Sequence, residues 1–214
     1  MAQELGLRER KKLQTRRLIA ETARRLFAER SFEAVTVAEI ARAADVSEAT
    51  VFNYFPTKED LFYSGLEAFE EELLSSIRER EPGESVLAAF GRFVLEPRGL
   101  LAAKDPDTVE RLAAITRVIS ESPALLAREQ RIFAGYTDSL AALIADETRA
   151  GTGDIEPWVA ANALMGVHRA LVAYARRAIL AGTRNPRLAR EVRTQTMRAL
   201  AMLERGLADY ATKE

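Results

Sequence analysis

The stretch "VSEATVFNYFPTKEDL", residues 46–61, decides how the N-terminal part of this chain folds. Ser47 is a good helix N-cap, so we expect a short helix over residues 48–54. Thr57, followed three residues later by Asp60, predicts a reciprocal capping box at the start of the next helix. The stretch therefore predicts two helices in close succession, the first of them too short to form a core alone.

The residues just upstream predict a partner for this short helix. Thr36 and Glu39 form a second capping-box pattern, which predicts a helix over about residues 37–44. Asp45 lies in the turn, where a short polar side chain tolerates the left-handed backbone conformation. Two short helices joined by about three residues form a helix-turn-helix pattern. A long helix with an apolar stripe, from about residue 8 to residue 30, precedes the pair.

The rest of the chain also predicts helices, and no strand pattern or repeat is found in it. The helix that starts at Thr57 is expected to run to about Arg80. Five more helices are expected from capping, proline and glycine signals: one at about residues 84–95, one that starts at Pro106, and three at about residues 123–148, 157–180 and 186–210. The fold class is therefore all-α with about nine helices. We expect a helix-turn-helix domain over residues 1–56 and a larger helical domain over residues 57–214.

Composition excludes several classes of site. Cysteine is absent and His168 is the single histidine, which leaves no thiolate or His-rich metal site and few routes to acid–base catalysis. No glycine-rich phosphate loop or nucleophile–base motif is present. We therefore expect no enzyme, no metal and no cofactor. No apolar run approaches the length of a membrane span and the N-terminus is charged, so we expect a soluble cytoplasmic protein without a membrane partner.

Charge is unevenly distributed along the chain. The net charge of the whole is −1, but residues 1–30 hold nine Lys or Arg against four acidic residues, a net charge of +5, which leaves −6 for the remainder. A basic end of this kind suggests contact with a polyanion, although a solvated helix face would have the same composition. Arg10, Lys11 and Lys12 are candidates for contact with DNA phosphates or the minor groove, with plain solubility as the alternative.

Residues 14–63 resemble the N-terminal DNA-binding domain of the tetracycline-repressor (TetR) family of transcriptional regulators. The resemblance lies in "LIAETARRLFAERSFEAVTVAEIARAADVSEATVFNYFPTKEDLF", which covers about fifty residues. It implies a dimer that binds a palindromic DNA operator and a body that binds a small-molecule effector. Beyond this domain the chain agrees with the family only in the number, length and order of its helices.

The short helix at 48–54 has the side chains that base readout requires. Small residues at its start permit approach to the major groove, and Ser47, Glu48 and Ala49 fit that need. Asn53 can pair with adenine, Glu48 can accept from cytosine, and Ala49 or Phe52 can contact a thymine methyl group. These five residues are the candidate base contacts.

Four further positions are implied by the resemblance as phosphate contacts, namely Thr36, Thr50, Tyr54 and Lys58. Lys58 lies in the first helical turn, where the helix dipole disfavours a cation but would favour a bound phosphate. A solvated lysine without a role is the alternative. Phe52 departs from the family, which commonly has tyrosine there, and the missing hydroxyl leaves either an apolar base contact or a core position. Phe55 is expected in the core, as its family counterpart is.

The resemblance also implies a pocket and a dimer interface in the body. Candidate pocket residues combine aromatic, apolar and polar groups, as a ligand site requires; they are Phe90, Phe93, Arg117, Phe133, Tyr136, Asn162, Met165, His168 and Arg169. Ordinary core and surface positions would have the same composition. Candidate interface residues lie on the last two helices, with intramolecular core as the alternative; they are Ala163, Gly166, Ala170, Val192, Ala199 and Leu203.

The sequence thus predicts a dimeric repressor that an apolar or amphipathic ligand releases from its operator. An activator or a regulator without a ligand is the alternative within the same class. A small all-helical enzyme is the alternative from another class, and no catalytic motif supports it.

Overall fold

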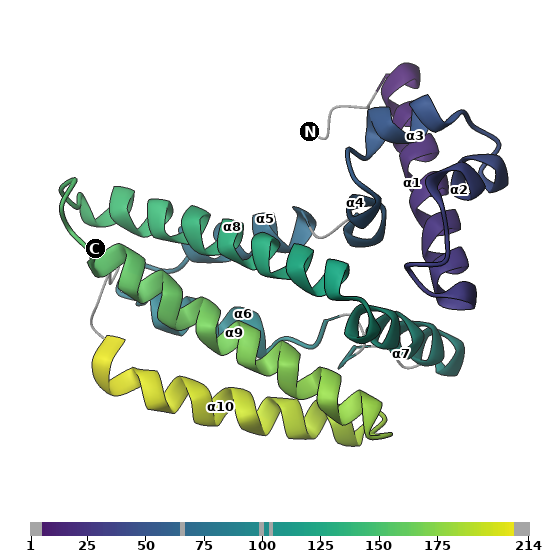
Figure 1. Ribbon diagram of the computed structural model, residues 1–214. Coiled ribbons are helices and arrows are strands. Elements are labelled where there is room, and N and C mark those ends of the chain that lie inside the picture. Colours follow the sequence, from purple (N-terminus) through teal and green to yellow (C-terminus); the bar gives the residue numbers. More distant parts are fainter. Residues whose placement is uncertain (1–5, 65–66, 99–100, 103–104, 208–214) are drawn as a thin grey trace. The chain divides into compact units, whose positions relative to one another are not determined.

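The computed structural model describes residues 6–64, 67–98, 101–102 and 105–207 (Figure 1). In these residues it has ten α-helices and no strand. The all-α expectation is confirmed. Contacts divide the chain into two compact units, residues 1–66 with 117–126 and residues 67–116 with 127–214.

The first unit contains the expected helix-turn-helix. Helix α1 (Leu7–Arg30) precedes α2 (Val37–Ala43), α3 (Glu48–Tyr54) and α4 (Lys58–Tyr63). All three capping signals are confirmed, because the side chains of Thr36, Ser47 and Thr57 each accept a hydrogen bond from the backbone N–H three residues later. Asp45 has φ of 54°, the left-handed conformation expected in the turn.

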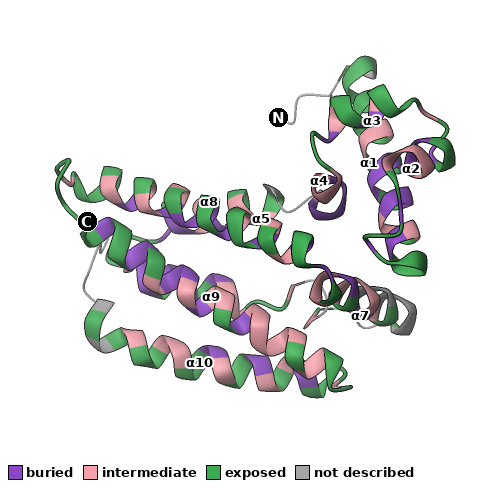
Figure 2. Ribbon diagram, in the orientation of Figure 1, coloured by how far each residue is buried: buried purple, intermediate pink, exposed green. Residues whose placement is uncertain are grey.

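Buried apolar side chains hold these short helices on α1. Phe27, Ile40, Val51, Phe55 and Leu61 are at most 1% exposed. They come from all four helices, and their buried faces are purple in Figure 2. Burial of this kind, at roughly 1.5–3 kcal/mol for each large apolar side chain, compensates for the weak intrinsic stability of helices only six or seven residues long.

The helix expected from Thr57 to about Arg80 is two helices. Helix α4 ends at Tyr63, and α5 covers Glu67–Arg78. The expected domain boundary after Pro56 also differs from the contact division, which keeps residues up to 66 in the first unit. The reason is that α4 packs on α1, with the rings of Phe62 and Phe27 centred 6.0 Å apart.

Residues 117–126 group with the first unit through two side-chain hydrogen bonds. The Tyr63 hydroxyl donates to the backbone carbonyl oxygen of Leu125 at 3.0 Å. The Ser122 hydroxyl donates to a carboxylate oxygen of Glu33 at 2.5 Å. Ser122 is fully buried and lies between the end of α7 and the start of α8. No capping or periodicity signal predicted these long-range contacts.

Beyond α5, the helices of the body agree closely with the expected ones. They are α6 (Val86–Leu95), α7 (Pro106–Glu121), α8 (Pro123–Thr148), α9 (Glu156–Leu180) and α10 (Arg187–Leu207). The α9 terminus confirms its glycine signal, because Gly182 has φ of 88°, a conformation that glycine adopts without strain. Gly91 lets α6 approach α10, since a Cβ there would lie 3.1 Å from a methyl carbon of Leu200.

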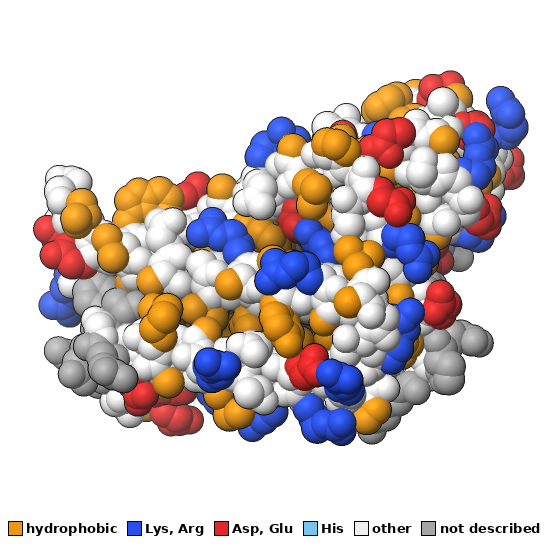
Figure 3. Space-filling model, turned by 60° about the horizontal axis from the view of Figure 1, so that its bottom comes forward, with side chains coloured by type: hydrophobic (Ala, Val, Ile, Leu, Met, Phe, Trp, Pro, Cys, Tyr) orange, Lys and Arg blue, Asp and Glu red, His pale blue; other side chains and the backbone are white. Residues whose placement is uncertain are grey.

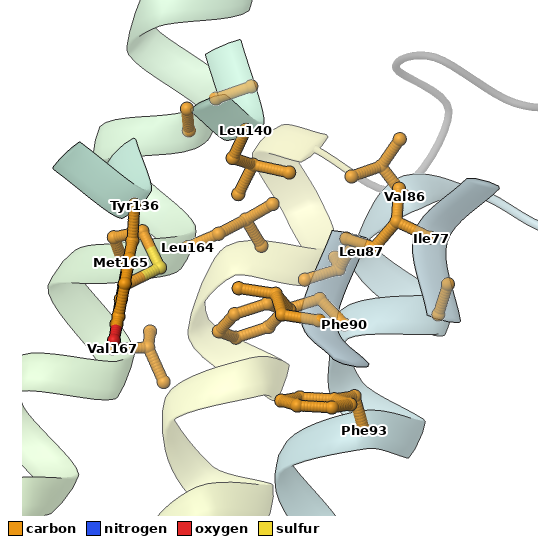
Figure 4. Packing of buried hydrophobic residues seen from close by; sticks show 14 of the residues in the cluster. Ile77, Val86, Leu87, Phe90, Phe93, Tyr136, Leu140, Leu164, Met165 and Val167 are labelled. Atoms are coloured by element: carbon orange, nitrogen blue, oxygen red, sulfur yellow. The ribbon is translucent and has the colours of Figure 1, made fainter. Parts of the chain in front are cut away.

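A hydrophobic cluster forms the core of the body. Figure 4 shows Phe90 and Phe93 from α6 converging with Tyr136 and Leu140 from α8 and with Met165 from α9. Among the described residues of the body, two ion pairs have little solvent exposure: Arg80, just after α5, pairs with Glu147 of α8, and Arg176 of α9 pairs with Glu129 of α8, each at 2.6 Å. Among the described residues, no helix is long and apolar enough to cross a membrane.

Candidate nucleic-acid interface

Helix α3 has one face in the core and the other in solvent. Val51 and Phe55 are 0% and 1% exposed and fix the helix on the unit. The five candidate base contacts all lie on the exposed side: Ser47, Glu48, Ala49, Phe52 and Asn53. A hydrogen-bonding amide, a carboxylate and two apolar groups are thus presented together from a firmly seated helix. This is the combination that readout in a major groove requires.

The structure decides whether Phe52 is a core residue or an exposed one. Phe52 is 49% exposed, whereas Phe55, three residues later, is buried. Phe52 is therefore no core residue in this structure, and its ring lies on the same surface as Asn53. An apolar contact with DNA stays a prediction for Phe52, and the burial of Phe55 agrees with the role expected for it.

The hydroxyl groups at the start of α3 are bonded to each other. The Ser47 Oγ accepts a hydrogen bond from the backbone N–H of Thr50 and lies 2.8 Å from the Thr50 hydroxyl oxygen. A hydroxyl can rotate and keeps acceptor and donor capacity, so Thr50 remains able to contact a phosphate. Its phosphate role is still a prediction.

Thr36 lies at the exposed start of α2, inside a charged network. Its hydroxyl and backbone N–H donate to one carboxylate oxygen of Glu39, and Arg30 donates to the other at 2.6 Å. These hydrogen bonds, from the Thr36 backbone first and then from Arg30, lower the pKa of Glu39 to about 2. The network fixes the start of α2 and keeps Glu39 ionised at neutral pH.

Lys58 has internal partners in this structure. Its ammonium donates to the backbone carbonyl oxygen of Phe32 and lies 4.3 Å and 5.6 Å from the ring centroids of Phe32 and Phe27. Burial lowers the pKa of Lys58, and the nearby carboxylate of Glu33 acts in the opposite direction. Lys58 therefore fastens α4 to the turn after α1. The alternative of a solvated lysine without a role does not hold, and its phosphate contact stays a prediction.

The basic N-terminal residues belong to a helix. Arg10, Lys11 and Lys12 lie within the first two turns of α1, and all three are exposed. Lys11 and Lys12 line a surface hollow together with Tyr54 at the end of α3, whereas Arg10 does not. The sequence pointed to these residues by charge alone and gave no sign that a helix brings two of them next to Tyr54.

The pocket candidates of the body separate into three groups. Phe90, Phe93, Phe133, Tyr136 and Met165 belong to the hydrophobic cluster. His168 joins them through ring contacts with Phe133 and with Phe69, which was not among the candidates. The polar candidates lie elsewhere: Asn162 is exposed and donates to the Trp158 carbonyl oxygen, Arg169 is half-buried, and Arg117 is exposed and belongs to the first unit.

His168 should make the stability of the body depend on pH. Although the residue as a whole is half-buried, its ring packs on Phe69 and Phe133, at centroid distances of 4.8 Å and 5.4 Å. Burial, aided by the charge of Arg169, lowers its pKa from 6.5 to about 4. As pH falls from about 6.5 toward 4, the unfolded state binds this proton first, so the folded state loses stability.

We expect the difference in free energy of unfolding between pH 7 and pH 5 to be smaller for His168→Phe than for the wild-type chain. Urea titrations followed by the fluorescence of Trp158, the single tryptophan, would measure it. An equal pH dependence in both proteins would contradict the low pKa.

The candidate residues of the dimer interface are more exposed on α9 than on α10. On α9, Ala170 is exposed and Ala163 and Gly166 are half-buried. On α10, Val192 is 6% exposed, and Ala199 and Leu203 pack against the hydrophobic cluster of the same chain. For α10 the structure therefore favours the intramolecular alternative.

The body also has large apolar residues that are exposed to solvent: Ile155, Trp158, Val159, Leu180, Met197 and Met202. Figure 3 shows hydrophobic side chains between charged groups on one face of the molecule.

Within the described residues, no group of three or more His, Asp or Glu side chains is placed to hold a metal ion.

Comparison with known proteins identifies the family of the N-terminal domain. Residues 19–64 match the family described as "Bacterial regulatory proteins, tetR family". The chain is 30% identical over 142 residues to the HTH-type transcriptional regulator TcmR of Streptomyces glaucescens, covering 65% of this chain and 63% of TcmR, slightly less than two thirds of that relative.

Two solved structures share the fold. NalD, the secondary repressor of the MexAB-OprM multidrug efflux pump in Pseudomonas aeruginosa, has a TM-score of 0.56 at 23% identity, covering 92% of this chain and 98% of NalD. FadR from Bacillus subtilis in complex with stearoyl-CoA has a TM-score of 0.53 at 20% identity, covering 86% of this chain and 97% of FadR. The helix-turn-helix, its exposed α3 face and these similarities lead to one conclusion: residues 19–64 belong to the TetR family of bacterial regulatory proteins, whose members bind DNA and are not enzymes.

Proposed function

We propose that this chain is a dimeric cytoplasmic repressor that binds a palindromic operator through α3 and releases it when a small ligand binds the helical body. The observation that carries the proposal is the two-sided α3. Its core face is buried through Val51 and Phe55, and its outer face presents Phe52 and Asn53 to solvent. A short helix held so firmly can keep a fixed register in a groove, which sequence-specific binding requires.

Dimerisation is supported by exposed apolar surface at the start of α9. Ile155, Trp158 and Val159 are 66%, 49% and 54% exposed, and contiguous apolar surface of this kind is typical of an interface. Ala163, Gly166 and Ala170 continue along the same helix at spacings of three and four residues and would permit close approach of a second helix. A two-fold dimer would place two α3 helices in successive major grooves, about 34 Å apart.

Ligand control is supported by the composition of the body. Its hydrophobic cluster contains the rings of Phe90, Phe93, Phe133 and Tyr136, with His168 at its edge. An apolar or amphipathic effector suits such surroundings. NalD, which has the same fold, represses an efflux pump, and FadR was crystallised with stearoyl-CoA, an amphipathic ligand. The ligand would act only by binding the released conformation more tightly than the DNA-bound one.

The test is selection of bound fragments from genomic DNA, followed by titration of single-base operator variants. We expect Asn53→Ala to cost about 1–3 kcal/mol at one base position of each half-site and to relax preference there. We expect Tyr54→Phe to weaken binding to all variants about equally, because a phosphate contact carries no sequence information. If wild-type protein selects no common sequence, the proposed function fails. If both variants bind every operator as the wild type does, the assignment of α3 fails.

A further inference from the structure

A groove lies on the body between α6 and α10, two helices of the same compact unit. It has a volume of about 480 Å³, and its lining residues lie in the ranges 85–95 and 197–204. We call it the α6–α10 groove. On α6 the lining residues Ala88, Gly91 and Leu95 follow one another at helical spacing, so they share one face of that helix.

Small residues leave the space of the α6–α10 groove open. Gly91 has no side chain, and Ala88 and Ala201 are exposed. A Cβ at position 91 would already lie 3.1 Å from a methyl carbon of Leu200, so the two helices approach closely there. A large side chain at either exposed alanine would fill the groove without entering this close contact.

The lining of the groove is mainly apolar. Leu87 is 7% exposed and belongs to the hydrophobic cluster of the body, and Leu200 packs against that cluster. Met197, which is 45% exposed, adds a flexible and polarisable thioether that adapts to ligands of different shape. An apolar molecule would therefore gain free energy by leaving water for this groove.

The size of the groove suits a small molecule better than a protein partner. Its volume lies within the range of about 300–1,000 Å³ that is typical of small-molecule sites. Ten described residues line it, whereas a stable protein interface involves roughly 20–30 residues on each side.

The charges at the groove favour a cation. Arg92 and Glu204 both line it. The Arg92 guanidinium is already engaged, because its Nε and Nη2 atoms donate to the two carboxylate oxygens of Glu84 at 3.3 Å. Glu204 is exposed and forms no ion pair with any residue that the structure describes. The carboxylate of Glu204 would therefore attract a cation in the groove and repel an anion.

We propose that the α6–α10 groove binds a hydrophobic monovalent cation. The apolar part of the ligand lies between α6 and α10, and its amine or quaternary ammonium group lies at the Glu204 carboxylate. The site is formed by residues of the body alone and requires no DNA. The inference therefore goes beyond the proposed function and does not depend on it.

Methionine methyl groups provide a readout that locates the ligand. Met197 lines the groove, Met165 is buried in the hydrophobic cluster, and Met202 is 74% exposed and does not line the groove. Isotope-labelled methionine methyl groups can be followed by NMR during a titration of the full chain with octyltrimethylammonium. We expect the Met197 signal to shift until the site is saturated and the Met165 and Met202 signals to stay in place. Octanesulfonate, which has the same alkyl chain and the opposite charge, should bind about 3- to 10-fold more weakly.

Two variants with matched controls test the residues of the site. Glu204→Gln should weaken the binding of octyltrimethylammonium by about 2- to 5-fold, as expected for an exposed ion pair, and strengthen that of octanesulfonate. Glu71→Gln, at an exposed position of α5 outside the groove, should change neither affinity. Ala88→Phe should fill the groove and lower the affinity for octyltrimethylammonium at least about tenfold. Ala142→Phe, at an exposed position of α8, should leave that affinity unchanged.

Three results would overturn the proposal: a shift of Met165 without one of Met197, tighter binding of octanesulfonate than of octyltrimethylammonium, or an unchanged affinity in Ala88→Phe. Sedimentation of the wild type and of Ala88→Phe tests a different occupant. If Ala88→Phe lowers the degree of association and no probe shifts Met197, a second copy of the chain occupies the groove and the proposal also fails. None of these measurements uses an operator, so the proposed function is tested separately.

Discussion

Replacing Phe55 with alanine is expected to lower the free energy of unfolding of the first unit by about 3–5 kcal/mol, the range for deletion of a buried aromatic ring. Phe55 is 1% exposed, and its ring also lies 5.2 Å from the guanidinium carbon of Arg16. The cavity would form directly beneath α3, so operator affinity should fall together with stability. Urea titration followed by far-UV circular dichroism, with anisotropy titrations of the selected operator, measures both effects.

Phe52→Ala is the matched control, because it removes the same ring from the same short segment. Phe52 is 49% exposed, so its removal should change stability by no more than about 0.5 kcal/mol. Any loss of operator affinity in this variant would then come from a lost contact with DNA. A destabilisation by Phe52→Ala as large as that by Phe55→Ala would contradict the placement of these two rings on opposite sides of α3.

Local signals in the sequence were sufficient for most of the fold. The capping residues Thr36, Ser47 and Thr57 and the terminator Gly182 each act within a few residues, so the helix ends could be predicted without knowledge of distant contacts. The position of α3 in the chain could be predicted from the same capping residues. The exposure of Phe52 could not be predicted, since a phenylalanine suits either face of a short helix until its neighbours are known.

The remaining features depend on contacts between residues far apart in the chain. The Ser122 hydrogen bond to Glu33 spans 89 positions, and the Lys58 bond to the Phe32 carbonyl oxygen spans 26. No periodicity or capping rule reports such pairs. The packing partner of the apolar stripe on α10 could not be predicted for the same reason. An apolar stripe has the same spacing whether it packs within one chain or between two.

The second large effect is expected at the ion pair between Arg80 and Glu147. The Arg80 side chain is 2% exposed and donates to the carbonyl oxygens of Ile77 and Glu84 as well as to the Glu147 carboxylate, 2.6 Å away. Glu147→Leu would remove the carboxylate that pairs with this buried guanidinium, and breaking a buried pair in this way costs about 3–5 kcal/mol. We expect this loss in urea titrations followed by Trp158 fluorescence, which reports on the body.

The double variant Arg80→Met with Glu147→Leu distinguishes a buried charge from lost packing. The double variant removes both charges and keeps an apolar side chain of similar size at each position. It should therefore be more stable than Glu147→Leu alone, even though it carries one more substitution. Arg78→Met, two positions away at an exposed site, should cost less than about 0.5 kcal/mol. If the double variant is as unstable as the sum of the two single changes, the cost lies in packing and hydrogen bonds to Ile77 and Glu84, and the ion pair contributes nothing of its own.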